Sequence, residues 1–196
     1  MNKTIFLCAV SLACVVTVCA APAKGKVAAR RPAAQRSAAF PETAFRRTPY
    51  VGAIAVDAQT GEVLFERHAD AVARPASVTK LMTLLLCLED MHAFKYDPTT
   101  RVTASVRCCQ ERPSSVGLKP GQSMTVDDLL MSIMVRSAND AAVLLAEHST
   151  AANAGRAIEP GDLQAFVLRM NNKARELGMA HTHYAPPNGY PPKPGS

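Results

Sequence analysis

The sequence lacks an apolar run long enough to cross a membrane. Its longest run extends from Ile5 to Val18, after the positive charge of Lys3, and is shorter than the roughly 20 residues that a spanning helix needs. Small residues then lead to Ala20. This pattern predicts a signal peptide over residues 1–20, which exports the chain to the periplasm or the cell-wall side of the cytoplasmic membrane. An uncleaved anchor is the alternative.

Cysteine is scarce in the rest of the chain. Beyond residue 20, the sequence contains only Cys87, Cys108 and Cys109. An odd number of cysteines, without zinc-type spacing, argues against a fold built on disulfides or structural zinc. His181 and His183 form a His-x-His pair, but no third ligand stands at a convincing spacing. No metal site is therefore predicted.

The folded part of the chain also lacks an excess of basic charge. Residues 21–47 are rich in alanine and proline and hold seven basic residues against one acidic residue, whereas residues 48–196 hold fourteen against fifteen. A nucleic-acid-binding domain carries its positive charge on the fold itself, so DNA and RNA are not predicted partners. We expect residues 21–47 to be a linker near an anionic wall or membrane surface, and residues 48–196 to be the folded body.

The folded body contains a hairpin followed by helices. Period-two patterns and the turn Gln59-Thr60-Gly61 predict two strands, and helical periodicity with capping residues predicts the helices. The predicted strands are residues 50–57, 62–68, 101–103 and 181–184, and the predicted helices are residues 75–89, 126–136, 140–148 and 162–177.

The first helix, residues 75–89, carries apolar residues on almost every face, which predicts a position in the core. Ser77 and Lys80 lie three residues apart at its start, so their side chains project from one face. Burial lowers the pKa of a lysine, and a neutral amine can take a proton from a serine. The alternative is a serine near a helix start and an unrelated lysine. A chain of this composition is expected to contain about 0.5 Ser-x-x-Lys patterns by chance, so the pattern alone does not decide between the two.

A second polar group stands at Ser137-Ala138-Asn139, between two predicted helices. These residues could be a helix cap, since Ser and Asn are favoured there. The other interpretation is a second wall of a site, with a hydroxyl that relays protons and an amide that holds a peptide substrate, and the residues alone favour the cap.

Several runs resemble, in order, the motifs of the low-molecular-mass penicillin-binding proteins, which are serine D-alanyl-D-alanine carboxypeptidases. The resemblance covers about residues 45–190. Its blocks are residues 75–83, 117–121, 125–130, 137–142 and 170–179, and the turn Asn188-Gly189.

The resemblance implies an α+β fold of the penicillin-binding-protein and serine β-lactamase type, with an antiparallel sheet, flanking helices and a mostly helical lobe. Ser77 would attack the carbonyl between the terminal D-alanines of a peptidoglycan stem peptide, with Lys80 as the base. Ser137 would relay a proton to the leaving D-alanine, and Asn139 would hydrogen-bond the substrate backbone and Lys80. β-Lactams would acylate Ser77, and no metal or organic cofactor is required.

The third motif of the family, Lys-Thr-Gly on a strand, does not occur in the 196 residues. It is expected on the order of a hundred residues after Ser137. Because its strand supplies an oxyanion donor, its loss typically costs about a hundred- to a thousandfold in rate. We therefore expect a fragment of a longer protein or a decayed copy, with low activity, marginal stability and exposed apolar surface on the first helix.

Two other functions remain open at this point. A class A β-lactamase would have Ser-Asp-Asn where this chain has Ser137-Ala138-Asn139, and its deacylating glutamate cannot be placed. A non-catalytic, truncated wall-binding paralogue would instead bind peptidoglycan through residues 21–47.

Overall fold

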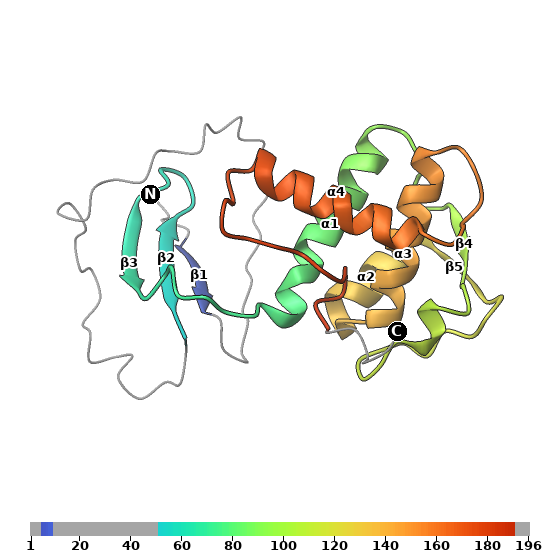
Figure 1. Cartoon of the computed structure of the whole chain (residues 1–196), viewed down its shortest axis with the longest axis horizontal. Helices are drawn as coiled ribbons and strands as arrows, with labels where there is room; N and C mark the ends of the chain where they lie inside the picture. The colour runs from blue at the N-terminus through green and yellow to red at the C-terminus, as the bar shows by residue number, and fades with distance from the viewer. Residues whose placement is uncertain (1–4, 10–50, 191–196) are drawn as a thin grey trace. The chain divides into compact units, whose positions relative to one another are not determined.

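The computed structural model describes residues 5–9 and 51–190, which fall into two compact units, Met1–Arg74 and Pro75–Ser196 (Figure 1). We call the first the hairpin unit and the second the helical unit. No helix in the described residues is long and apolar enough to cross a membrane.

The hairpin unit is an antiparallel sheet of three strands in the order β1 (Ile5–Ala9), β2 (Ala53–Asp57) and β3 (Val63–Arg67). The two strands predicted for the hairpin, residues 50–57 and 62–68, are confirmed with shorter bounds. The register places Ala55 opposite Phe65, and these residues form a small apolar cluster with Ala53. The turn between β2 and β3 is stabilised by the Asp57 carboxylate, which accepts two backbone N–H groups at 2.9 Å.

Strand β1 is the beginning of the apolar run that the sequence assigns to a signal peptide. Its backbone pairs with β2 along the whole strand, from Ile5 opposite Asp57 to Ala9 opposite Ala53. The rest of that run and the proposed linker, residues 21–47, lie outside the described residues. Cleavage after Ala20 therefore stays a prediction.

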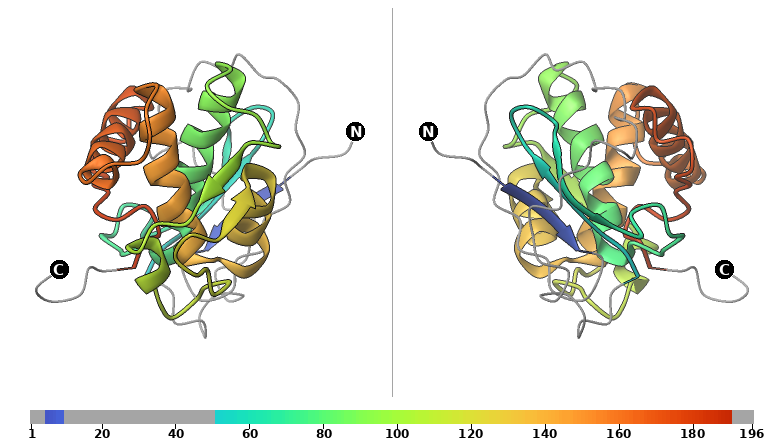
Figure 2. Two further views of the ribbon diagram at one scale, coloured as in Figure 1. Left: turned by 90° about the vertical axis from the view of Figure 1, so that its right-hand side faces the viewer. Right: turned by 90° about the vertical axis from the view of Figure 1, so that its left-hand side faces the viewer.

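The helical unit is organised around α3 (Asn139–Asn153), which packs against the other three helices (Figure 2). These are α1 (Lys80–His92), α2 (Val126–Arg136) and α4 (Asp162–Glu176). Helix α3 is built from small and apolar residues on every face, from Ala141 to Ala146, and all of these are buried. A helix of this composition can lie in the centre of a core without leaving space around it.

Helices α2 and α4 have almost the predicted bounds, and their ends follow from their sequences. The hydroxyl of Thr125 caps α2 by accepting the Asp128 N–H at 3.1 Å, as predicted. Gly178, with a φ of 74°, follows the last turn of α4. A left-handed residue of this kind ends a helix with little strain when it is glycine.

Four predictions about the helical unit need correction. The helix predicted at residues 75–89 is a 3₁₀ turn, Ala76–Thr79, followed by α1, which extends to His92. Residues 181–184 form no strand. Helix α3 is longer than residues 140–148, because alanines and polar residues continue it to Asn153. A small antiparallel sheet pairs β4 (Arg101–Thr103) with β5 (Ser123–Thr125). The sequence predicted β4 but not β5, because a strand of three residues shows too little alternation of apolar and polar residues.

Helix α1 is not buried on all sides. Leu81 and Leu88 are 50% and 52% exposed, and Leu85 between them is half-buried. Residues at this spacing share one face of a helix, so α1 carries an apolar stripe. The prediction of complete burial is wrong for this face, whereas the expectation of exposed apolar surface on the helix is confirmed.

Candidate active site

Ser77 lies in a single 3₁₀ turn, Ala76–Thr79, that leads directly into α1. The side chain of Ser77 is exposed, whereas Lys80, the first residue of α1, is only 3% exposed. The Lys80 Nζ atom lies 3.0 Å from the Ser77 Oγ atom. The local turn thus holds an accessible hydroxyl against a buried amine, as the spacing of the two residues predicted.

The Lys80 amine has three hydrogen-bond partners. In addition to Ser77, Nζ donates to Ser137 Oγ at 3.3 Å and to the backbone carbonyl of Asn188 at 2.9 Å. No carboxylate forms an ion pair with Lys80 in the described residues, and burial lowers the pKa of Lys80 from 10.5 to about 8. At that pKa, about a tenth of the amines are uncharged at pH 7.

Ser137 stands at the corner between α2 and α3 and has a left-handed backbone, with a φ of 53° and a ψ of 38°. This conformation is uncommon outside glycine and asparagine, and hydrogen bonds to a neighbouring loop hold the corner in place. The Ser114 hydroxyl donates to the Arg136 carbonyl at 2.7 Å, and the Asn139 N–H donates to the Ser114 carbonyl at 2.7 Å. The corner therefore fixes the hydroxyl of Ser137 in front of Lys80.

The same loop is anchored by Asp140, which is fully buried. Its carboxylate accepts the backbone N–H groups of Val116, Gly117 and Leu118 at 3.0–3.1 Å. Such bonds to a charged acceptor are stronger than neutral ones. Asp140 thus connects the corner of the site to the loop that runs beside it.

Asn139 is near this group but does not join it. Its side chain is 3% exposed, and its Oδ1 atom is buried without a hydrogen-bond partner among the described residues. The hydrogen bond to Lys80 that the family resemblance implied is not formed. The Asn188 carbonyl is instead the third partner of the amine.

The turn at residues 187–189 is a part of the site that the sequence did not assign to it. Thr83 donates to the Pro187 carbonyl at 2.6 Å, which places the Asn188 carbonyl on Lys80. A methyl group on Gly189 would overlap the carbonyl of Ala76, and the φ of Gly189 is 72°. Only glycine allows this close approach without strain. The sequence indicated a turn here but not what it touches.

Glu111 is the other site residue that sequence reasoning missed. It lies in a segment without periodicity, and its Oε2 atom accepts the side-chain N–H of Asn188 at 2.9 Å. The Asn188 side chain also accepts the Tyr190 N–H at 3.0 Å, and Asn188 is only 2% exposed. Glu111 therefore helps to fix the residue whose carbonyl binds Lys80.

The arrangement is suited to nucleophilic catalysis. A serine hydroxyl is activated when a neighbouring base can take its proton, and a partly uncharged Lys80 between two hydroxyls can do so. In the described residues, no group of three or more His, Cys, Asp or Glu could hold a metal ion.

Residues 48–193 match the family described as D-alanyl-D-alanine carboxypeptidase. The chain belongs to this family. Among curated relatives, the carboxypeptidase DacF of Bacillus subtilis is 34% identical over 137 residues, which is 70% of this chain and 33% of that protein. The carboxypeptidase DacA of Escherichia coli strain K12 is 33% identical over 142 residues, which is 69% of this chain and 33% of that protein.

Solved carboxypeptidase structures share the fold. The DacD carboxypeptidase of Francisella tularensis has a TM-score of 0.67 and 28% identity, over 84% of this chain and 36% of that one. The Mycobacterium tuberculosis carboxypeptidase has a TM-score of 0.62 and 33% identity, over 74% and 49%. The predicted α+β fold of the penicillin-binding-protein type is confirmed.

The chain spans about a third of the length of these curated relatives. Some other relatives are named D-alanyl-D-alanine endopeptidases. Membership of the family therefore establishes the fold and the class of chemistry.

Proposed function

We propose that the protein is a serine D-alanyl-D-alanine carboxypeptidase that acts on peptidoglycan stem peptides outside the cytoplasmic membrane. One observation carries the proposal, the buried Lys80 amine between the hydroxyls of Ser77 and Ser137. Its partners are two neutral hydroxyls and a carbonyl, so its environment favours the uncharged, basic form. The family membership supports the substrate class, and the apolar N-terminal run supports the location.

In the proposed reaction, Ser77 Oγ attacks the carbonyl of the last peptide bond while its proton passes to Lys80 Nζ. The proton then reaches the nitrogen of the leaving D-alanine through Ser137, which contacts the same amine. The carbon–nitrogen bond breaks and leaves an ester on Ser77. Water attacks this ester with Lys80 again as the base, which releases the shortened peptide and regenerates the hydroxyl.

Asn139 has a role in this proposal that its surroundings suggest. Its buried Oδ1 atom has no partner among the described residues, and a buried acceptor without a donor is unfavourable. A peptide N–H of the substrate would supply that donor. We therefore propose Asn139 as a substrate-binding residue and Ser77, Lys80 and Ser137 as the catalytic residues.

Acylation by a fluorescent penicillin tests this proposal. We expect a covalent adduct on the peptide that contains Ser77, located by mass spectrometry, and no adduct in Ser77→Ala. Release of D-alanine from a stem pentapeptide would be measured on the same samples. Fast turnover of the penicillin would indicate a β-lactamase. A folded protein that gives no adduct, yet binds peptidoglycan equally well as Ser77→Ala, would replace the carboxypeptidase by a binding role.

A further inference from the structure

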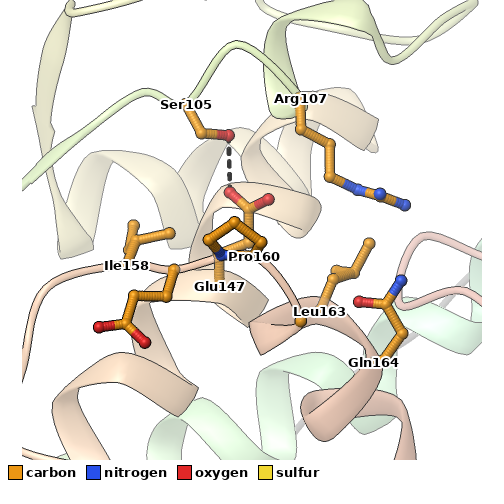
Figure 3. A pocket seen from close by; sticks show the side chains of 9 residues that line it. Ser105, Arg107, Glu147, Ile158, Pro160, Leu163 and Gln164 are labelled. Carbon is orange, nitrogen blue, oxygen red and sulfur yellow. Dashed lines mark hydrogen bonds between the residues drawn. The ribbon is translucent and has the colours of Figure 1, made fainter.

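A pocket lies in the helical unit, and Figure 3 shows the side chains that line it. Its volume is about 450 Å³. Its walls come from α3, from the connection between α3 and α4, from the first turn of α4, and from the loop after β4. None of Ser77, Lys80, Ser137 or Asn188 lines it.

Glu147 supplies a buried carboxylate to this pocket. It lies on α3, two helical turns beyond Asn139, and is only 4% exposed. Its Oε2 atom accepts the Ser105 hydroxyl at 2.7 Å, and its other oxygen has no hydrogen-bond partner in the described part of the chain. Burial raises the pKa of Glu147. A carboxylate in this position retains an acceptor for a donor in the pocket.

Arg107 supplies a positive charge to the same pocket. In Figure 3 its side chain extends beside the Glu147 carboxylate and not onto it. Neither residue makes an ion pair among residues 51–190, although the charge of Arg107 acts to lower the pKa of Glu147. Glu159 also lines the pocket, but its carboxylate is exposed and pairs with Arg156 at 3.5 Å. Glu147 and Arg107 are thus the acidic and the basic group of the pocket that make no ion pair among the described residues.

The remaining walls define the space between and beside these charges. Ile158, Pro160 and Leu163 make one apolar side, and Gln164 adds an amide that can donate and accept hydrogen bonds. A pocket with mostly apolar walls and a few placed polar groups is the usual form of a small-molecule site. Its volume exceeds what a single amino acid fills.

From this arrangement we infer that the pocket is a second binding site for a small zwitterion, a free α-amino acid or dipeptide with an apolar side chain. The ligand ammonium donates to the free oxygen of Glu147, and its carboxylate pairs with the Arg107 guanidinium. The apolar side chain lies against Ile158 and Leu163. Opposite charges on one ligand match Glu147 and Arg107, the two charged groups of the pocket without an ion pair among the described residues, whereas an ion of one sign would meet repulsion from one of them.

Titration calorimetry and amide NMR shifts of the full 196-residue chain test this inference. The probes are L-leucine, leucyl-leucine and D-alanine. We expect saturable binding of at least one of them, with shifts in residues 158–164 and around Ser105. N-acetyl-leucine and leucinamide each lack one charge, and we expect them to bind at least tenfold more weakly than leucine.

Two variants locate the binding. Glu147→Gln removes the charge but keeps an oxygen for the Ser105 hydroxyl, and Arg107→Gln removes the cation. We expect each to weaken binding at least tenfold, while circular dichroism reports the same fold. The matched controls, Asp127→Asn and Lys95→Gln, change the same charges at exposed positions outside the pocket and should leave the binding constant unchanged.

Several results would overturn the inference. They are equal binding in the pocket variants, equal binding of the singly charged probes, or no shift in residues 158–164 up to about 10 mM ligand with the folded wild type. If Glu147→Gln does not fold, Arg107→Gln and the singly charged probes decide the matter alone. Penicillin labelling of Ser77 on the same samples reports the proposed active site separately, so a failure there does not count against the pocket.

Discussion

Lys80 is the residue on which the proposed chemistry depends, and the burial that leaves part of its amine uncharged near neutral pH also has a cost for folding. The amine is buried and its partners are two hydroxyls and a carbonyl, none of which carries a charge. Burial of an ammonium group without a carboxylate disfavours its charged form. The folded protein therefore binds a proton at Lys80 less tightly than the unfolded chain does.

The effect of pH on stability tests this view of Lys80. Because burial lowers the pKa of Lys80 to about 8 in the folded protein from its ordinary value of 10.5, the unfolded chain holds the proton over that interval and the folded protein does not. We expect the unfolding free energy of the wild type to rise by up to about 3 kcal/mol between pH 8 and 10.5, relative to Lys80→Met, and to run parallel to it below pH 8. Urea unfolding of both proteins measures the difference. Parallel curves up to pH 10 would mean that Lys80 is not desolvated.

Glu111 offers a test of positioning at the same site. Glu111→Ala removes the acceptor for the Asn188 side chain, so the carbonyl that binds Lys80 loses its support. A hydrogen bond to a charged group contributes about 1.5–3 kcal/mol, and we expect penicillin acylation of Ser77 to slow roughly tenfold. Glu111→Gln keeps an oxygen acceptor and should recover most of the rate.

The rates are measured from pH 6 to 9, with Asp127→Ala as a control for an exposed carboxylate. If Glu111→Gln is as slow as Glu111→Ala, the charge and not the hydrogen bond is what matters. If both variants react at the wild-type rate, Asn188 needs no support from Glu111.

At the scale of secondary-structure elements, three helices meet at one polar cluster. Asp90 on α1 accepts Arg169 of α4 at 2.7 Å and also accepts the hydroxyl of Ser149 on α3. Arg169 in turn donates to Ser149 at 2.8 Å and lies over the Phe166 ring. Each of these polar side chains has a hydrogen-bond partner within the cluster, which is the condition under which buried charges are tolerated.

Arg169→Met should therefore destabilise the helical unit strongly. It leaves the buried Asp90 carboxylate without its cation, and the loss of one partner of a buried pair typically costs about 3–5 kcal/mol. Urea unfolding followed by far-ultraviolet circular dichroism measures the change. Arg175→Met on the exposed side of the same helix serves as the control, with an expected change within about 0.5 kcal/mol. A similar small change in Arg169→Met would make the cluster dispensable.

The sequence predicted the helices well because their periodicity and caps are local. Thr125 at the start of α2 and Gly178 after α4 mark ends that depend on residues within one turn. The three-residue spacing of Ser77 and Lys80 predicted that they share one face, and the position of Ser137 between two helices predicted that it could form a second wall of the site.

Residues brought in from a distance could not be found in this way. Glu111 and Asn188 meet across 77 positions, and no local pattern records that contact. No local pattern records the hydrogen bond between Ser105 and Glu147 either, since these two residues of the proposed amino-acid pocket are 42 positions apart. Local sequence patterns predict helices, strands and short-range pairs of residues, whereas contacts such as that between Glu111 and Asn188 depend on tertiary packing.

At the scale of the whole molecule, we expect the apolar stripe of α1 to promote self-association in solution. Leu81 and Leu88 are half-exposed on one face, and a contiguous apolar surface of this kind favours self-association. We expect Leu81→Gln with Leu88→Gln to lower the association seen by light scattering and the fluorescence of a bound apolar dye. The unfolding free energy should fall by no more than about 3 kcal/mol, since each of the two side chains is only half-buried. Unchanged scattering would assign any association to another surface.

The packing of the Asn188-Gly189 turn against the first turn of α1 also sets an order in time. Lys80 donates one of its three hydrogen bonds to the carbonyl of a residue 108 positions further along the chain, and Thr83 donates to the carbonyl of Pro187. A nascent polypeptide that has left the ribosome only as far as the end of α4 already contains both serines and the lysine, but not this acceptor. The hydrogen bonding of Lys80 is thus completed only after residues 187–189 have been made.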